Sequence, residues 1–194
     1  MQSNVSRPEI LAKFSDIVAK SLHIDVATIT PASFLNDLGA ESLDLIEITM
    51  ETEETFNLWI SEKSILQTAT EVFGPNVLEK DGVLTDAGKA LLMDRMPGLD
   101  PGSLEGEVAV ADITKQFLRV DAWVHLIDGL LSQTPQSCPQ CDAPLPNAIA
   151  FKMKCKQCGT ETPLPSGEEL NKQWAIDFRE RYFLSAPRAQ AAAS

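Results

Sequence analysis

The chain has 194 residues and a net charge of −12, and 44% of its residues are apolar. This composition suits one domain of ordinary size, or a small domain with appendages, and it excludes a compositionally disordered chain. The acidic balance argues against nucleic-acid binding, for which a basic surface is expected. The chain lacks both the roughly 18 consecutive apolar residues of a membrane span and the apolar run of an N-terminal secretory signal. We therefore expect a cytoplasmic protein.

The first predicted elements are two helices separated by a loop. Residues 7–22 are predicted to be helical because apolar residues recur there at helical spacing, at Ile10, Phe14, Ile17, Val18 and Leu22. A loop follows and ends at residues 34–40. The second helix is predicted to begin at Ser42, as its N-cap, and to run to about Phe56.

The later elements are less regular. Residues 61–70 are predicted to form a short helix, and residues 85–96 a helix capped by Thr85. Residues 97–103 hold two Pro-Gly pairs and are typical of a linker. Strong amphipathic periodicity predicts a helix over residues 117–131, and a last helix is expected over about 168–183.

The helix that begins at Ser42 carries two apolar stripes. Successive helical residues turn by about 100°, which places one stripe nearly opposite the other: Leu43, Ile46 and Met50 against Leu45, Ile48, Thr52 and Phe56. A helix on the surface of a small bundle needs only one such stripe to reach the core. The first stripe is edged by acidic residues, namely Asp44, Glu47, Glu51 and Glu54.

Two interpretations of this helix are open. A helix buried on all sides would use both stripes, and an acidic edge can simply be a solvated face. An apolar strip edged with like charge is also the expected design of a transient docking surface for basic partners. No Lys or Arg lies between Lys20 and Lys63, so we predict that this face docks partners.

The residues around Ser42 carry a family resemblance. The run from Asp37 to Asp44, Asp-Leu-Gly-Ala-Glu-Ser-Leu-Asp, resembles the phosphopantetheine attachment motif of acyl carrier proteins. The resemblance covers about residues 7–62, with an amphipathic helix before the motif and an acidic helix after it. Residues 116–128 resemble the last helix of the family, which implies an insertion of about fifty residues before it. Glu41 departs from the Asp that is usual in the family.

The resemblance implies a carrier rather than an enzyme. Ser42 would hold 4'-phosphopantetheine, whose thiol carries an acyl or aminoacyl thioester, and Leu43, Asp44, Ile46, Glu47, Met50, Glu51 and Glu54 would dock the partners. Those partners would be a phosphopantetheinyl transferase and acyl-transferring or acyl-modifying enzymes of a pathway such as fatty acid or lipid biosynthesis. Independently, a phosphodiester at a helix start meets unpaired amides and the positive end of the helix dipole. The alternative is that Ser42 is only an N-cap.

The four cysteines form two pairs, Cys138–Cys141 and Cys155–Cys158, with 13 residues between the pairs. Two C-x-x-C pairs at this spacing can supply four thiolates to one tetrahedral ion, so we predict a Zn²⁺ site of zinc-ribbon type. Redox disulfides are disfavoured in a cytoplasmic protein, while mononuclear iron remains a rival metal. Such a closed site is structural, and residues 147–154 are predicted to form the strands of its hairpin.

The predicted architecture is mainly α-helical. Residues 1–133 would form an acyl-carrier-like antiparallel helical bundle with an insertion at about 71–116, residues 134–165 a small β zinc ribbon, and residues 166–194 a terminal helix and tail. No Gly-rich phosphate loop or nucleophile elbow is present, which disfavours an enzyme. The alternative function is a zinc-ribbon adaptor whose carrier-like part is an unmodified interaction module.

Overall fold

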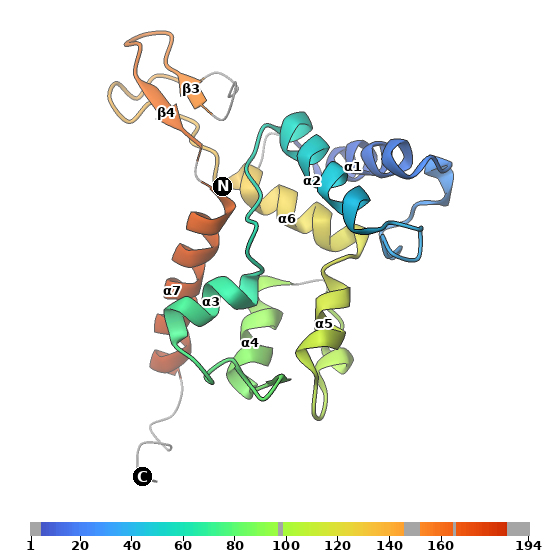
Figure 1. Cartoon of the computed structure of the whole chain (residues 1–194). Coiled ribbons are helices and arrows are strands. Elements are labelled where there is room, and N and C mark those ends of the chain that lie inside the picture. The colour runs from blue at the N-terminus through green and yellow to red at the C-terminus, as the bar shows by residue number, and fades with distance from the viewer. Residues whose placement is uncertain (1–4, 97–98, 146–151, 165, 186–194) are drawn as a thin grey trace.

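The computed structural model describes residues 5–96, 99–145, 152–164 and 166–185, and this part of the chain is mainly helical (Figure 1). The prediction of a mainly α fold is confirmed. The helices are α1 (Arg7–Leu22), α2 (Ser42–Phe56), α3 (Ile65–Phe73), α4 (Asp86–Arg95), α5 (Val110–Gln116), α6 (Val120–Ser132) and α7 (Gly167–Ser185). Two antiparallel pairs accompany them, β1 (Glu79–Lys80) with β2 (Val83–Leu84), and β3 (Lys152–Lys154) with β4 (Glu161–Pro163). Across the described ranges, no helix is long and apolar enough to cross a membrane.

Helices α1, α2 and α6 form one bundle with its own core. The apolar residues predicted along residues 7–22 meet the inward faces of α2 and α6, and Phe14 stacks on Trp123 with ring centroids 5.2 Å apart. The helix predicted over 117–131 is the observed α6, although it begins only at Val120. Most of residues 116–128, which resemble the last helix of acyl carrier proteins, thus lies in the same bundle as α1 and α2.

Helix α2 buries only one of its two apolar stripes. Ile48 and Thr52 are fully buried, and the Thr52 hydroxyl donates a hydrogen bond to the Ile48 carbonyl at 2.6 Å. On the opposite side, the side chains of Leu43, Ile46 and Met50 are 79%, 57% and 63% exposed. The interpretation of α2 as a helix buried on all sides is therefore wrong.

Helices α3, α4, α5 and α7 enclose a second core. Its buried residues include Leu66 and Ala69 of α3, which precede the start at 71 that the sequence suggested for the insertion. The short helix α5 was not predicted. After the linker at 97–103, the sequence suggested no helix before residue 117. The predicted linker is partly packed, because Leu99 and Leu104 are buried, while residues 97–98 lie outside the described ranges.

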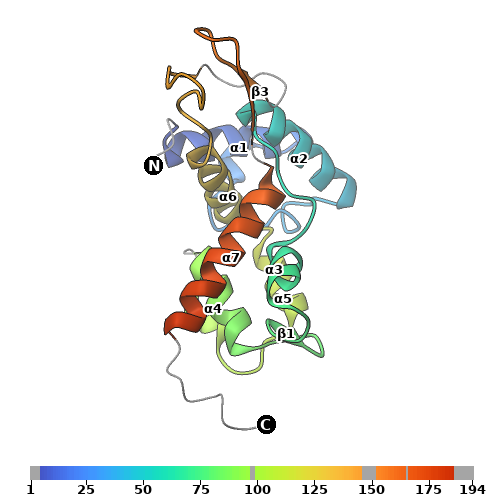
Figure 2. The same ribbon diagram turned by 90° about the vertical axis from the view of Figure 1, so that its left-hand side faces the viewer.

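Helix α7 joins the two cores. It lies against α3 (Figure 2), and its first residue, Gly167, donates a backbone hydrogen bond to the Trp59 carbonyl at 2.8 Å. A Cβ atom at Gly167 would lie 2.7 Å from the Ser61 nitrogen, so only glycine permits this approach. Lys63 also pairs with Glu168 at 2.7 Å.

The cysteine region is a small module at the upper end of the molecule in both views (Figures 1 and 2). Its strands differ from the predicted hairpin. Strand β3 lies in the predicted range, but its partner is β4, which follows the second cysteine pair, with Met153 opposite Thr162. Residues 147–151 of the predicted hairpin lie outside the described residues. The observed hairpin therefore encloses Cys155 and Cys158 in its turn.

A pair of substitutions on α2 tests this one-sided burial. Ile48→Ala should lower the free energy of unfolding by about 2–5 kcal/mol, because it removes buried methyl groups and leaves a cavity. Leu43→Ala, on the exposed side of the same helix, should change it by less than about 0.5 kcal/mol. Urea denaturation monitored by circular dichroism measures both. Equal losses for the two variants would mean that both faces are packed.

Candidate functional site

Ser42 is the first residue of α2, and its side chain is exposed. The N-cap residue is Glu41, with φ −100° and ψ 177°, so the prediction of Ser42 as the N-cap is wrong. The extended backbone ends one residue earlier than expected because the Asp44 carboxylate accepts a hydrogen bond from the Glu41 amide at 2.7 Å. Asp44 therefore caps the helix, and the Ser42 hydroxyl is not needed for capping.

The loop before Ser42 is tied to the junction between α5 and α6. The Leu35 side chain is fully buried, and its amide donates to the Leu118 carbonyl at 2.9 Å. The Ala40 amide in turn donates a hydrogen bond to the Leu35 carbonyl at 2.9 Å. Gly39 completes this tight turn with φ +99°, which other residues rarely adopt. These contacts hold the start of α2 in a fixed place.

An open hollow of about 480 Å³ lies beside Ser42. It is lined by residues of the preceding loop, of the first turns of α2 and of the α5–α6 junction: Asn36, Ala40, Glu41, Ser42, Leu43, Leu45 and Leu118. The first-turn amides of a helix lack intrahelical acceptors, and the dipole end there is positive. An exposed serine in this setting fits a covalently attached phosphodiester, which the hollow has room to admit.

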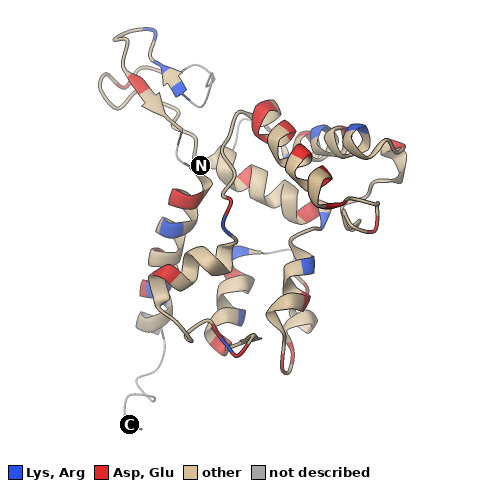
Figure 3. Cartoon of the chain, in the orientation of Figure 1, with Lys and Arg blue, Asp and Glu red and all other residues tan. Residues whose placement is uncertain are grey.

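Several acidic residues lie along α2 (Figure 3). Glu47 and Glu54 are exposed. Glu51 instead pairs with Lys20 of α1 at 2.6 Å, and this hydrogen bond raises the pKa of Lys20. The Asp44 carboxylate already accepts the hydrogen bond from the Glu41 amide. Of the four acidic residues that the sequence suggested for docking, Glu47 and Glu54 make no ion pair with the residues that the structure describes, and both are exposed.

Comparison with known proteins identifies the carrier part of the chain. The family described as phosphopantetheine attachment site matches residues 12–70. The acyl carrier protein of Rubrobacter xylanophilus is 43% identical over 67 residues, which are 34% of this chain and 83% of that protein. The chain belongs to the acyl carrier protein family.

Two further relatives agree. The acyl carrier protein of Helicobacter pylori is 46% identical over 57 residues, covering 27% of this chain and 73% of that protein. The acyl carrier protein of Karelsulcia muelleri is 49% identical over 55 residues, covering 28% of this chain and 66% of that protein. No solved structure matches. The family match ends at residue 70, so α4 to α7 and the four cysteines lie beyond it.

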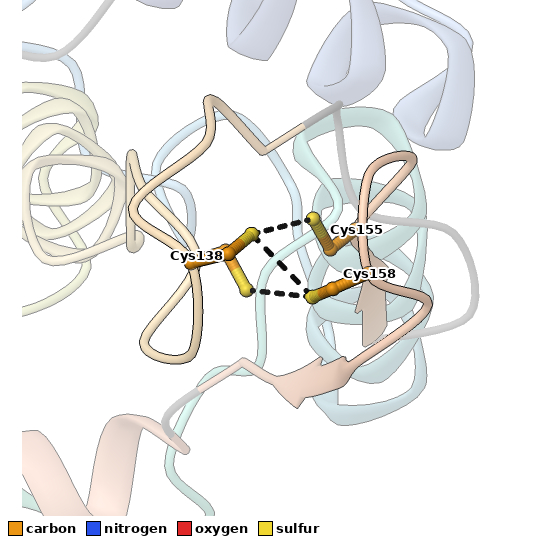
Figure 4. A group of neighbouring side chains, drawn as sticks. Cys138, Cys155 and Cys158 are labelled. Carbon is orange, nitrogen blue, oxygen red and sulfur yellow. Dashed lines mark hydrogen bonds between the residues drawn. The ribbon is translucent and has the colours of Figure 1, made fainter.

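The four cysteine thiols meet in one cluster (Figure 4). All four sulfur atoms lie within 4.8 Å of one another, and Cys138 and Cys158 are 3.5 Å apart, as are Cys141 and Cys158. Thiolates bound to one tetrahedral Zn²⁺ at about 2.3 Å lie about 3.8 Å from each other. The arrangement therefore fits a small zinc-binding module. Its two knuckles are closed by backbone hydrogen bonds. The Asp142 amide donates to the Cys138 carbonyl and the Gly159 amide to the Cys155 carbonyl, both at 2.9 Å.

The pKa values of two of the cysteine thiols are shifted in opposite directions. Hydrogen bonds with Thr160 lower the pKa of Cys158 to about 6. The backbone hydrogen bond of Ala143 lowers the pKa of Cys141, but the neighbouring thiols, Cys158 above all, raise it to about 12. Four thiols this close cannot all ionise unless a cation compensates their charge.

Sequence reasoning missed the residues that other segments contribute to the hollow at Ser42. Leu118 lines the hollow from a position 76 residues after Ser42. The resemblance of residues 116–128 to the last helix of the family was the only signal that placed this segment near the motif. Asn36 also lines the hollow, although its position before the motif carried no such signal.

Proposed function

We propose that this protein is a non-enzymatic acyl carrier, which holds an acyl or aminoacyl thioester on 4'-phosphopantetheine attached to Ser42. The observation that carries this proposal is the exposed Ser42 hydroxyl at the first turn of α2, beside an open hollow and inside the matched family region. The partner enzymes would transfer or modify the acyl group in a biosynthetic pathway, such as that of fatty acids or other lipids. Cytoplasmic location stays a prediction.

Attachment at Ser42 is tested by intact mass after incubation with coenzyme A and a broad-specificity phosphopantetheinyl transferase. We expect one phosphopantetheine increment on the peptide that contains Ser42. Ser42→Ala should abolish it, and Ser6→Ala, at the start of α1, should not. Glu41→Asp, which restores the residue usual in the family, should leave the rate similar or faster. No increment with several transferases would favour the alternative of an unmodified adaptor.

The exposed face of α2 is the proposed docking surface for the partner enzymes. Leu43, Ile46 and Met50 supply its apolar centre, and Glu47 and Glu54 supply exposed charge at its edge. Asp44 and Glu51 contribute less than the sequence suggested, because their carboxylates already bind Glu41 and Lys20. A basic partner would approach along this face.

Charge reversal separates docking from folding. Glu47→Lys should lower kcat/KM of the transferase by about fivefold or more at low salt, with a smaller loss at high salt, where charges are screened. Glu107→Lys makes the same charge change at another exposed position and should have little effect. Circular dichroism confirms that both variants are folded. Identical kinetics for the two variants would exclude Glu47 from docking.

We also propose that Cys138, Cys141, Cys155 and Cys158 bind one Zn²⁺ with a structural role, as in a zinc ribbon. The module has little apolar surface of its own, with Met153 and Leu164 as its buried apolar side chains apart from cysteine in the described ranges. Metal binding and local folding are therefore linked.

Metal analysis of the purified protein should find one zinc per chain. Cys158→Ser should lower the metal content and increase amide hydrogen exchange over residues 138–163, because folding there depends on the metal. Gln157→Ala, in the same knuckle, should change neither. Modification of Ser42 should persist after chelation if the modules are independent. Neither zinc nor iron, with four freely titrating thiols, would refute the site.

A further inference from the structure

A second and larger cleft opens between the α1–α2–α6 bundle and the second core. It has a volume of about 810 Å³, within the range of pockets that bind small molecules. Its lining comes from α2, from the segment after α2, from the end of α4, from the α5–α6 junction, from α6 itself and from the start of α7. Only the α2 wall and the segment that follows it belong to the region matched by the carrier family.

This cleft adjoins the hollow at Ser42. Leu45 and Leu118 line both spaces. Apolar side chains continue along the cleft, among them Ile46, Met96 and Phe117. A flexible chain attached at Ser42 therefore meets a continuous apolar surface on leaving the hollow.

The wall opposite α2 carries an unusual cation. Among the described residues, Arg95 is the one Arg or Lys of the cleft with no carboxylate in ion-pair contact, whereas Lys63 pairs with Glu71 and Glu168, and Arg119 with Asp121. Arg95 is half-buried, donates to the Asn171 amide oxygen at 3.0 Å and lies over the Trp174 ring. Burial lowers the pKa of its guanidinium. Partly buried charges are normally paired.

In the described part of the chain, no carboxylate lies within ion-pair distance of Arg95, although the neighbouring Asp94 attracts it electrostatically. The Glu53 carboxylate accepts a hydrogen bond from the Ile60 amide at 2.8 Å. Glu62 is the other acid of the lining and, within the described ranges, forms no ion pair with Arg95. Asp94, beside Arg95 in the chain, is engaged by Arg181 at 3.0 Å and by the Trp174 indole at 2.9 Å.

Two buried donors belong to the same lining. The Trp123 indole Nε1 and the Arg119 Nε are buried, and neither has an acceptor in the part of the chain that is described. Buried N–H groups of this kind normally have a partner. Because both atoms are closed to solvent, a carbonyl oxygen of a cleft ligand would reach them only after the neighbouring side chains shift.

We propose that this cleft receives the loaded arm of Ser42, and that its cargo is an acyl chain ending in a carboxylate, which Arg95 binds. The inference rests on the proposed attachment at Ser42. The apolar walls would cover the aliphatic part of the chain, Arg95 would pair with its terminal carboxylate, and Glu53 and Glu62 would repel a chain bound in any other register. The thioester would be shielded from nucleophiles in solution.

The experiment compares three loaded forms of the full chain. A transferase that accepts acyl-coenzyme A attaches arms that carry acetyl, octanoyl or the eight-carbon ω-carboxyacyl group, and intact mass confirms each loading on Ser42. Hydroxylamine then removes the acyl group, and its rate is followed by mass. We expect the ω-carboxyacyl form to react about fivefold or more slowly than the octanoyl form, the factor of one favourable ion pair, and the acetyl form to react fastest.

Variants assign the effect to the cleft. Arg95→Gln should bring the ω-carboxyacyl rate to the octanoyl rate. Asn171→Asp should do the same without loss of the guanidinium, because it gives Arg95 an internal carboxylate. Lys115→Gln, which neutralises an exposed cation outside the cleft, should leave all rates unchanged. Ala122→Phe, which fills part of the cleft, should make all three thioesters equally reactive.

An independent measurement uses the indole resonance of Trp123. Its NMR signal should shift when the ω-carboxyacyl form is compared with the unloaded arm, and Ala122→Phe should remove the shift. Equal hydroxylamine rates for all three forms, with no shift at Trp123, would overturn the proposal. So would slower modification of Ser42 in Ala122→Phe with unchanged acyl reactivity, because the cleft would then bind a partner protein. Failure to load Ser42 at all would refute the carrier function instead.

Discussion

The burial of one face of α2 is the constraint on which the rest of the carrier part depends. Ile48 and Thr52 are fully buried, and the Thr52 hydroxyl donates its hydrogen bond within its own helix, to the Ile48 carbonyl. Because successive helical residues turn by about 100°, fixing this face directs Leu43, Ile46 and Met50 to solvent. The same rotation leaves Ser42 exposed at the end of the helix, where phosphopantetheine can reach it.

The position of that helix end depends on a segment far along the chain. Backbone hydrogen bonds join Leu35 to Leu118, and Ser33 to Val120 at 3.0 Å. The residues between these segments include α3, α4 and α5 of the second core, so these helices are anchored beside the attachment site. This is why an acyl carrier domain acquires a cleft whose second wall lies outside the matched family region.

The cysteine module and α7 are held in place by other interactions than the carrier part. The module lies between α6 and α7, and few apolar side chains support it. A bound metal would therefore order the connection through which α7 returns to the helices. There, Gly167 contacts the Trp59 carbonyl and Glu168 pairs with Lys63. The metal centre would thus brace the wall of the cleft that α7 supplies, at a distance from the attachment site itself.

The sequence by itself determined the local features of this protein. Periodicity located α1, α2 and most of α6, the motif identified the carrier family, and the paired spacing of the cysteines indicated their cluster. Each of these signals lies within a few residues of the group it concerns. Only the tertiary structure decided the rest. It made Glu41 the N-cap in place of Ser42, because the Asp44 carboxylate accepts a hydrogen bond from the Glu41 amide. It also paired β3 with β4 and packed α7 on α3. It also left Arg95, among the described residues, without a carboxylate in ion-pair contact, because long-range packing decides such partners and local spacing does not encode them.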